Sequence, residues 1–542
     1  MRFLLPLLLL STAAAPAPQF NLPQLKSDVE TLSSDAFEGR APGTEGEKKT
    51  LAYLTKRMAE IGLKPGNKGE WLQPVPMVAI TTDPGAVITV TGGKAPVTLA
   101  MNKDVAVATR RPQAKVAVEA SDLVFAGHGI VAPERGWNDY ADLDVRGKTV
   151  LVLVNDPDWQ TAKAGADAGP FSGREMTYYG RYVYKFEEAL RQGAAAVLVI
   201  HADEPAGYPF GVIGSGVGRP VISLDRGDAP TLDYEGWITT EAATRVLAAA
   251  GLDLAALTKA AQQKGFKPVA TGLKASTTLD NKVVRSASNN VVGLLPGTKR
   301  PDEVVLYTAH WDHTGRCKAD ATGDDICNGA IDNASGTAGL LAIADAFAKA
   351  KRTERSVAFI AVTAEESGLL GSQYYAEHPV FPLGKTVGGV NMDGLNTDGV
   401  TEGITISGAG KSELEAMAEK VAAAQGRKLV PEASPEKGYY FRSDHFSLAK
   451  LGVPMLSAGS GGELVGKPPG SAEAAAADYV KNRYHQPGDE YDPNWNWDGA
   501  LQDLALYADI GRSLANSTAW PNWLPSSEFR TIRDKSRAGA SQ

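Results

Sequence analysis

Several acidic and histidine side chains stand where an apolar stretch of the sequence ends. They are His310 after residues 304–309, Glu365 and Glu366 after residues 356–363, and Asp393 just beyond residues 387–391. Each apolar stretch has the β-branched and aliphatic composition of a buried strand. Because parallel strands place their carboxyl ends at one edge of a sheet, where α/β proteins bind ligands, we expect these side chains to lie close together.

Two further residues complete a set that could bind metal ions. Asp332 precedes the long apolar segment 334–350, which has the pattern of a packed helix, and His485 lies in the polar loop 484–489. Imidazole and carboxylate ligands together suit zinc, and one carboxylate can bridge a pair of ions roughly 3.5–4 Å apart. Of two neighbouring glutamates, one can bind metal while the other acts as a general base. The pattern therefore predicts a site that activates water.

Length and charge limit the class of protein. A chain of 542 residues is too long for one compact core, so we expect at least two domains. A formal net charge of -8 argues against nucleic acid as a partner, which would require a concentrated basic face. Residues 1–15 combine one basic residue, an apolar run and small residues, which is typical of a secretory signal peptide. No other segment reaches about 18 apolar residues, so we expect an exported protein, periplasmic or secreted, without stable membrane insertion.

The two cysteines, Cys317 and Cys327, lie between His310 and Asp332. In an exported protein, two cysteines this close in sequence favour a disulfide that closes a small loop over two free thiols. Metal thiolates rank last, since the neighbouring histidine and aspartate suit a harder site.

The order of the predicted elements indicates a mixed α/β fold. From residue 289 onward, strand-like and helical segments alternate, which predicts a mostly parallel sheet between helices. A second alternation between residues 123 and 201 predicts a smaller α/β module inserted in the first. We therefore divide the chain into a signal peptide at 1–15, a main domain at 20–108 and 269–520, an inserted domain at 109–268, and a C-terminal tail at 521–542.

Six short motifs follow one another in a recognisable order. They are HWDH from residue 310, AIDNASG from 330, TAEESGLLGS from 363, NMDG from 391, YYFRSDHFSLAKLGVPML from 439, and RYHQPGDEYD from 483. Together they closely resemble the di-zinc exopeptidases of peptidase family M28, which contains bacterial aminopeptidases and glutamate carboxypeptidase. The inserted module resembles a protease-associated domain, with ADLDVRGKTVLV from residue 141 and GAAAVLVI from residue 193 as the matching features. The resemblance implies the zinc exopeptidase fold for the main domain.

Carried over to this sequence, the resemblance implies two Zn²⁺ ions and peptide substrates. The ligands would be His310 and Asp393 on one ion, Glu366 and His485 on the other, and Asp332 as the bridge. Glu365 would be the general base, Asp312 would orient His310, and Tyr440 would stabilise the oxyanion, with the adjacent Tyr439 as an alternative. His313 is expected outside the ligand set. In this family the peptide bond between Asp332 and Asn333 is often cis.

These roles predict a zinc aminopeptidase that cleaves the N-terminal peptide bond with a hydroxide activated by two metals. A carboxypeptidase or dipeptidase of the same family is the alternative, and it would need a cationic pocket, for which Arg442 is the nearest candidate. A mono-zinc glutaminyl cyclase is disfavoured by the full ligand set. A non-enzymatic, receptor-like ectodomain is a further alternative, although such relatives typically lose ligands or the base.

Overall fold

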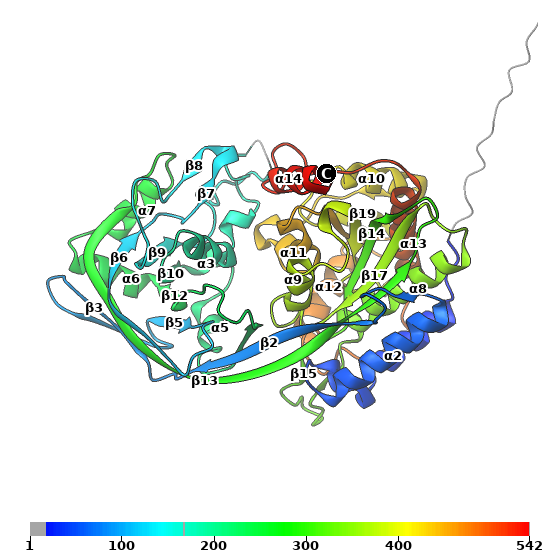
Figure 1. Ribbon diagram of the computed structural model, residues 1–542, viewed down its shortest axis with the longest axis horizontal. Coiled ribbons are helices and arrows are strands. Elements are labelled where there is room, and N and C mark those ends of the chain that lie inside the picture. The colour runs from blue at the N-terminus through cyan, green and yellow to red at the C-terminus, as the bar shows by residue number, and fades with distance from the viewer. Residues whose placement is uncertain (1–17, 166–167, 541–542) are drawn as a thin grey trace, which may run out of the picture.

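Figure 1 shows two lobes in the computed structural model, which describes residues 18–165 and 168–540. The signal peptide predicted at 1–15 lies outside the described residues. Two long strands connect the lobes, β2 (Leu72–Thr82) and β13 (Val269–Leu295), which pair antiparallel over residues 72–82 and 281–291. Among the described residues, each helix is too short or too polar to span a membrane.

A mixed, mostly parallel sheet forms the larger lobe. Its strands follow the order β2, β13, β17 (Arg355–Val362), β14 (Arg300–His310), β18 (Thr386–Asn391) and β21 (Met455–Leu464). The last four strands are parallel, whereas β13 is antiparallel to both of its neighbours. This arrangement confirms the predicted fold class.

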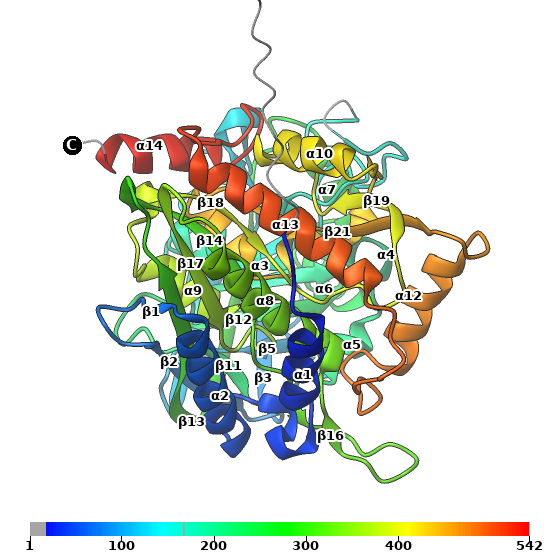
Figure 2. The same ribbon diagram turned by 90° about the vertical axis from the view of Figure 1, so that its right-hand side faces the viewer.

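Both faces of this sheet are buried, which explains the continuous apolar composition of its strands. In β14, Val305 and Tyr307 belong to one core, while Val304 and Leu306 belong to the core on the opposite face. The first face is covered by α1 (Leu22–Leu32), α2 (Glu45–Ile61), α8 (Gly336–Lys349) and α13 (Asp498–Asn516), which Figure 2 shows together. The second is covered by α9 (Leu370–Glu377) and α11 (His445–Lys450).

The smaller lobe has its own sheet and its own apolar core. Its strands follow the order β4 (Val97–Ala100), β3 (Val87–Thr91), β13, β6 (Lys115–Phe125), β9 (Thr149–Leu153), β10 (Ala196–His201), β12 (Tyr234–Thr239) and β5 (Val105–Ala108). Helices α3 (Tyr182–Arg191), α6 (Thr240–Ala249) and α7 (Leu254–Ala261) accompany it. The domain boundary at 108/109 stays a prediction, but strand pairing places residues 87–108 in the sheet of this lobe.

An aromatic cluster joins the lobes at a second place, away from the paired strands. Tyr178 of the smaller lobe lies 5.0 Å from Phe446 and 6.1 Å from Phe441 of the larger lobe, measured between ring centroids. Beside it, Lys450 of the larger lobe forms a 2.9 Å ion pair with Glu187 of α3. The two lobes are thus connected both by backbone pairing and by side-chain packing.

The C-terminal segment predicted as a tail contains a helix, α14 (Arg530–Ala540). Its Arg533 is 1% exposed and donates hydrogen bonds to the main-chain oxygens of Leu383 (3.1 Å), Thr386 (2.8 Å) and Val387 (3.2 Å). The polar composition of this segment gave no sign in the sequence that the helix packs on the larger lobe, because the side chain that anchors it, Arg533, is itself charged.

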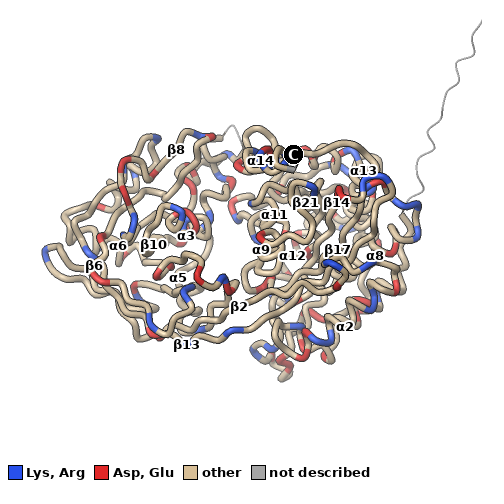
Figure 3. The backbone as a smooth tube through the Cα atoms, in the orientation of Figure 1, with Lys and Arg blue, Asp and Glu red and all other residues tan. Residues whose placement is uncertain are grey.

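The two cysteines close a short hairpin. Cys317 and Cys327 form a disulfide with their Cα atoms 5.9 Å apart, beside the two-residue strands β15 (Gly315–Arg316) and β16 (Ile326–Cys327). The disulfide prediction is confirmed. Figure 3 shows that basic and acidic residues are interspersed along the backbone of both lobes.

Candidate metal centre

One half of the centre lies where β14 and β18 end. The Nε2 atom of His310 is 3.1 Å from Oδ1 of Asp393 and 3.2 Å from Oδ1 of Asp332. The three donor atoms lie within 4.8 Å of one another, a spacing at which one cation could contact all of them. The side chain of His310 is almost fully buried, so its position is fixed by packing.

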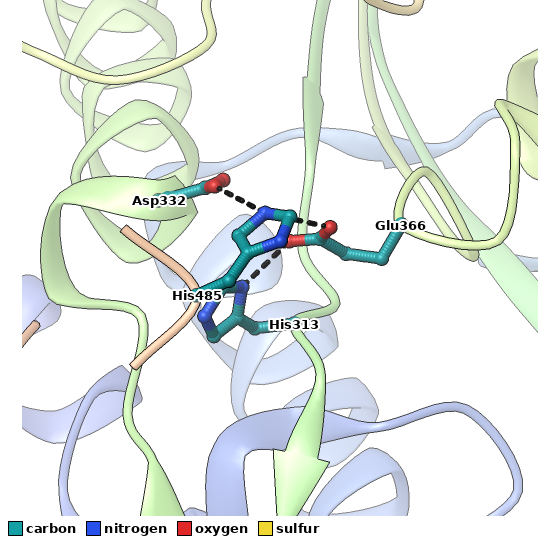
Figure 4. Close-up of side chains that lie close together, drawn as sticks. All are labelled: His313, Asp332, Glu366 and His485. Carbon is teal, nitrogen blue, oxygen red and sulfur yellow. Dashed lines mark hydrogen bonds and ion pairs between the residues drawn. The ribbon is translucent and has the colours of Figure 1, made fainter. Parts of the chain in front are cut away.

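The other half shares Asp332 and adds a later loop. The Nε2 atom of His485 is 3.3 Å from Oδ2 of Asp332 and 3.0 Å from Oε2 of Glu366. His313 joins this group, with Nδ1 2.6 Å from Oε1 of Glu366, and Figure 4 shows the four side chains converging. His313 was expected outside the ligand set. The position of His313, three residues after the end of β14, does not show in which direction the loop orients the imidazole ring.

The two oxygens of Asp332 therefore face two different histidines. The hydrogen bonds from His310 and His485 lower the pKa of Asp332, although burial alone would raise it. In turn, Asp332 and Glu366 raise the pKa of His485 to about 10 against the opposing effect of burial. The carboxylates of the cluster thus create a negative potential that favours cations.

The turn that carries Asp332 is fastened to the His485 loop by Asp489. The carboxylate of Asp489 accepts hydrogen bonds from the main-chain N–H groups of Ile331 (3.0 Å) and Asp332 (3.1 Å). The peptide bond between Asp332 and Asn333 is cis, as the resemblance implies. One carboxylate therefore sets the distance between the bridging candidate and a ligand that is about 150 residues away in the sequence.

Asn333 connects the same turn to the loop after β18. Its Nδ2 donates to the main-chain oxygen of Met392 (3.1 Å), and its Oδ1 accepts from the N–H of Gly394 (2.9 Å). These bonds flank Asp393, so the side chain after Asp332 positions the ligand on the neighbouring strand.

Arg40 organises the loops beneath the cluster. Its guanidinium is fully buried and donates to four main-chain oxygens, those of Leu32 (2.7 Å), Trp311 (2.9 Å), Asn328 (2.6 Å) and Gly329 (2.8 Å). Burial lowers the pKa of Arg40 to about 10, which leaves it charged at neutral pH. The arginine thus ties the residues next to His310 to those that lead into the Asp332 turn.

Substituting Arg40 with Gln is expected to lower the free energy of unfolding by at least about 3 kcal/mol, because several hydrogen bonds to a charged donor are lost and buried carbonyls remain unpaired. Urea unfolding followed by tryptophan fluorescence would measure the change. Arg316→Gln is the matched control, since this arginine lies in the adjacent hairpin but pairs with Asp325 at the surface, where a loss of less than about 1 kcal/mol is expected. Equal losses in both variants would contradict the role given to Arg40.

Glu365 lies beside the cluster with its carboxylate unengaged. Its main-chain N–H donates to Oδ1 of Asp312 (3.1 Å), and no other described residue forms a hydrogen bond or ion pair with its side chain. Burial raises the pKa of Glu365 well above its usual range, with His310 acting in the opposite direction. A carboxylate without a partner in this position is free to exchange a proton with a substrate or water.

Asp312 lies next to both His310 and Glu365. The Nδ1 atom of His310 lies 3.1 Å from the main-chain oxygen of Asp312, but 3.8 Å from its carboxylate. The carboxylate instead holds the backbone of Glu365. Burial raises the pKa of Asp312 to about 7.

Tyr440 packs in the aromatic cluster at the lobe junction. Its ring lies 4.7 Å from that of His445, and its hydroxyl is buried without a hydrogen-bond partner among the described residues. The adjacent Tyr439 is 45% exposed. In this structure, no described interaction joins either hydroxyl to the ligand atoms.

A cavity of about 590 Å³ opens between the lobes and reaches the cluster. Glu365, Glu366 and His485 line it from the larger lobe. Arg181 and Tyr182, at the start of α3, line it from the smaller lobe. Its size suits a small ligand of a few residues.

The sequence was compared with known families and proteins. The model of peptidase family M28 matches residues 290–508. The chain is 28% identical to Aminopeptidase YwaD of Bacillus subtilis (strain 168), over 40% of this chain and 37% of that protein. It is 32% identical to Leucine aminopeptidase 2 of Trichophyton equinum, over 37% of this chain and 42% of that protein. The matched segments thus span less than half the length of these two relatives.

Solved structures of similar proteins include an aminopeptidase from Aneurinibacillus sp. strain AM-1, with a TM-score of 0.44, 19% identity, and coverage of 92% of this chain and 95% of that one. BSAP, a zinc aminopeptidase from Bacillus subtilis, gives a TM-score of 0.41 and 19% identity, with coverage of 95% of this chain and 100% of that one. The segment that the family model matches holds the five predicted ligands and Glu365. Residues 290–508 are thus the part of this chain that is similar to peptidase family M28.

Proposed function

We propose that the protein is an exported zinc aminopeptidase that removes one residue from the N-terminus of peptides and uses two Zn²⁺ ions. The observation that carries the proposal is the position of Asp332, whose two carboxylate oxygens each face a different histidine. One carboxylate shared between two donor sets is the arrangement that a pair of metal ions requires.

The donor atoms fit zinc. His310 and Asp393 would hold one ion, Glu366 and His485 the other, and Asp332 both. His313 would support the second set through Glu366. Imidazole nitrogens and carboxylate oxygens are common zinc ligands, and the carboxylates of Asp332, Glu366 and Asp393 supply negative charge to the cluster. Bound zinc polarises a carbonyl group and makes water more acidic.

The protein's own residues would then move the proton. Glu365 would accept it from the attacking water and deliver it to the leaving amine, a task that its unengaged carboxylate permits. Asp312 would keep Glu365 in place through the hydrogen bond to its main-chain N–H. Tyr440 would donate to the oxyanion of the tetrahedral intermediate, and its hydroxyl, which has no partner among the described residues, is available for that bond.

The disulfide supports export, because disulfides persist in oxidising compartments. A periplasmic or extracellular location is therefore part of the proposal. Fractionation of cells that produce the protein, with blotting of each fraction, would test it. Recovery in the cytoplasm alone would contradict export.

The function is tested with a panel of aminoacyl chromogenic substrates and of peptides blocked at either end, with and without a chelator. We expect hydrolysis only where the N-terminus is free, its loss with the chelator, and its recovery with zinc. Cleavage of peptides blocked at the N-terminus would favour a carboxypeptidase. The absence of chelator-sensitive hydrolysis across the whole panel would favour a binding protein.

A further inference from the structure

The cavity between the lobes is lined by two arginines that form no ion pair with a carboxylate of the residues that the structure describes. Arg181 precedes α3 in the smaller lobe, and Arg442 follows the Tyr440 segment in the larger lobe. Among the described residues, neither guanidinium has a carboxylate oxygen within 4.0 Å. Arg181 contacts the sulfur of Met176 at 4.0 Å and lies 5.5 Å from the ring centroid of Tyr182. Arg442 lies 5.4 Å from the ring centroid of Tyr439.

The other cations on the cavity wall are paired. Arg110 forms a 2.5 Å ion pair with Glu235, Arg226 a 2.5 Å pair with Glu377, and Lys450 a 2.9 Å pair with Glu187. Glu187, Asp225 and Glu235, which also line the cavity, are each engaged in an ion pair, Asp225 with Arg285 at 2.8 Å. The positive charge left over on this wall thus belongs to Arg181 and Arg442.

The two arginines line the same cavity but differ in exposure: Arg181 is partly buried, whereas Arg442 is exposed. Burial lowers the pKa of Arg181, and the positive charge of Arg442 acts in the same direction. Guanidinium groups match carboxylates through paired hydrogen bonds, so a carboxylate in the cavity would find two donors without an acidic partner of their own among the described residues.

The lining of the cavity therefore combines two unlike groups of side chains. Glu365, Glu366 and His485 belong to the candidate metal centre, whereas Arg181 and Arg442 add positive charge from both lobes. Figure 1 shows α3 of the smaller lobe facing α9 and α11 of the larger lobe across this space. A peptide with its N-terminal residue at the centre would extend its leaving part along the cavity.

We propose that Arg181 and Arg442 form a carboxylate-binding subsite for the leaving part of the peptide, so that the enzyme favours short peptides carrying a carboxylate there. The inference rests on the proposed aminopeptidase function and adds the substrate class. The carboxylate could be the C-terminus of a dipeptide or an acidic side chain next to the cleaved bond, and the experiment separates the two.

The zinc-loaded, full-length protein is assayed on Leu-Leu, Leu-Leu-amide, Leu-Asp-amide and Leu-Asn-amide, with leucine p-nitroanilide as a substrate that carries no carboxylate. A C-terminal subsite predicts a kcat/KM for Leu-Leu at least about tenfold above that for its amide. A side-chain subsite predicts the same preference for Leu-Asp-amide over Leu-Asn-amide. Either preference supports the proposal.

Arg181→Gln and Arg442→Gln should each reduce this preference by roughly tenfold, mainly through KM, while hydrolysis of leucine p-nitroanilide stays near its wild-type rate. Arg181→Lys should retain part of the preference, because it keeps the charge but loses the paired hydrogen bonds. Arg226→Gln is the matched control, since this arginine lines the same cavity but is paired with Glu377, and it should leave the preference intact.

The outcomes separate the two proposals. No chelator-sensitive cleavage of any of these substrates would overturn the aminopeptidase function itself. Cleavage of leucine p-nitroanilide with equal kcat/KM for charged and amidated peptides would leave that function standing and overturn the subsite. A preference that survives in the Arg181→Gln, Arg442→Gln double variant would also overturn it.

Discussion

Glu365→Gln is expected to lower kcat by roughly 10²–10⁴-fold, the contribution of a well-placed general base, while zinc stays bound. Glutamine keeps the shape of the side chain but cannot accept and return a proton. The side chain of Glu365 forms no hydrogen bond or ion pair with another described residue, so its replacement should leave the ligand geometry unchanged. Metal content by elemental analysis, next to steady-state rates, would measure both parts of the prediction.

Glu419→Gln serves as the control for this change. Glu419 is an exposed residue of α10 (Leu414–Ala424), remote in sequence from every predicted ligand, and its substitution should leave kcat unchanged. If the Glu365 variant kept a rate near that of the control, another group would have to be the base. If it lost zinc, Glu365 would be a ligand instead.

Asp332→Asn is expected to abolish activity by removing zinc, in contrast to the Glu365 variant. An amide presents one carbonyl oxygen and an NH₂ group, so it cannot offer a negatively charged oxygen to each of two ions. We expect the zinc content to fall from about two ions per chain to about one or fewer. Equilibrium dialysis against zinc would give the stoichiometry and the affinity.

The control for this variant is Asp345→Asn, on the helix that follows the Asp332 turn. Asp345 pairs with Lys349 near the surface, 2.6 Å away, and contacts no predicted ligand. Melting curves of both metal-free variants would show whether the fold is intact. Two zinc ions retained by the Asp332 variant would refute the bridging role.

The convergence of the candidate ligands was predictable because its sequence signals are local. Each of the strands that precede His310, Glu365 and Asp393 is a continuous apolar run, which marks a strand buried on both faces. The parallel order of these strands then brings their ends together. Order along the chain was enough to predict that these side chains meet.

The residues that hold the ligands in place were not predictable in this way. Arg40 binds only main-chain oxygens, so no partner side chain in the sequence marks its role. Asn333 and Asp489 stand inside the quoted motifs, but they also act on backbone groups of distant segments. Hydrogen bonds to backbone leave no compositional trace.

Sheet membership was also beyond the sequence. The strand-like pattern of residues 87–91 predicts a strand, but it cannot say which sheet that strand joins. The answer depends on β13, whose residues 274–277 pair with β3 while its residues 291–295 pair with β17 of the other lobe. When one strand is long enough to belong to two sheets, the packing of the whole molecule determines which strands pair with each of its ends.

The two connections between the lobes turn the molecule into a closed frame. A single flexible linker would allow the lobes to rotate apart. Here the paired strands β2 and β13 join the lobes on one side of the cavity, and an aromatic cluster joins them on the other. Rotation of one lobe away from the other would break either the strand pairing or the aromatic contacts. We therefore expect the width of the opening to change little. Under the proposed function, a flexible N-terminus would enter this opening, whereas an N-terminus packed into a compact protein would stay outside.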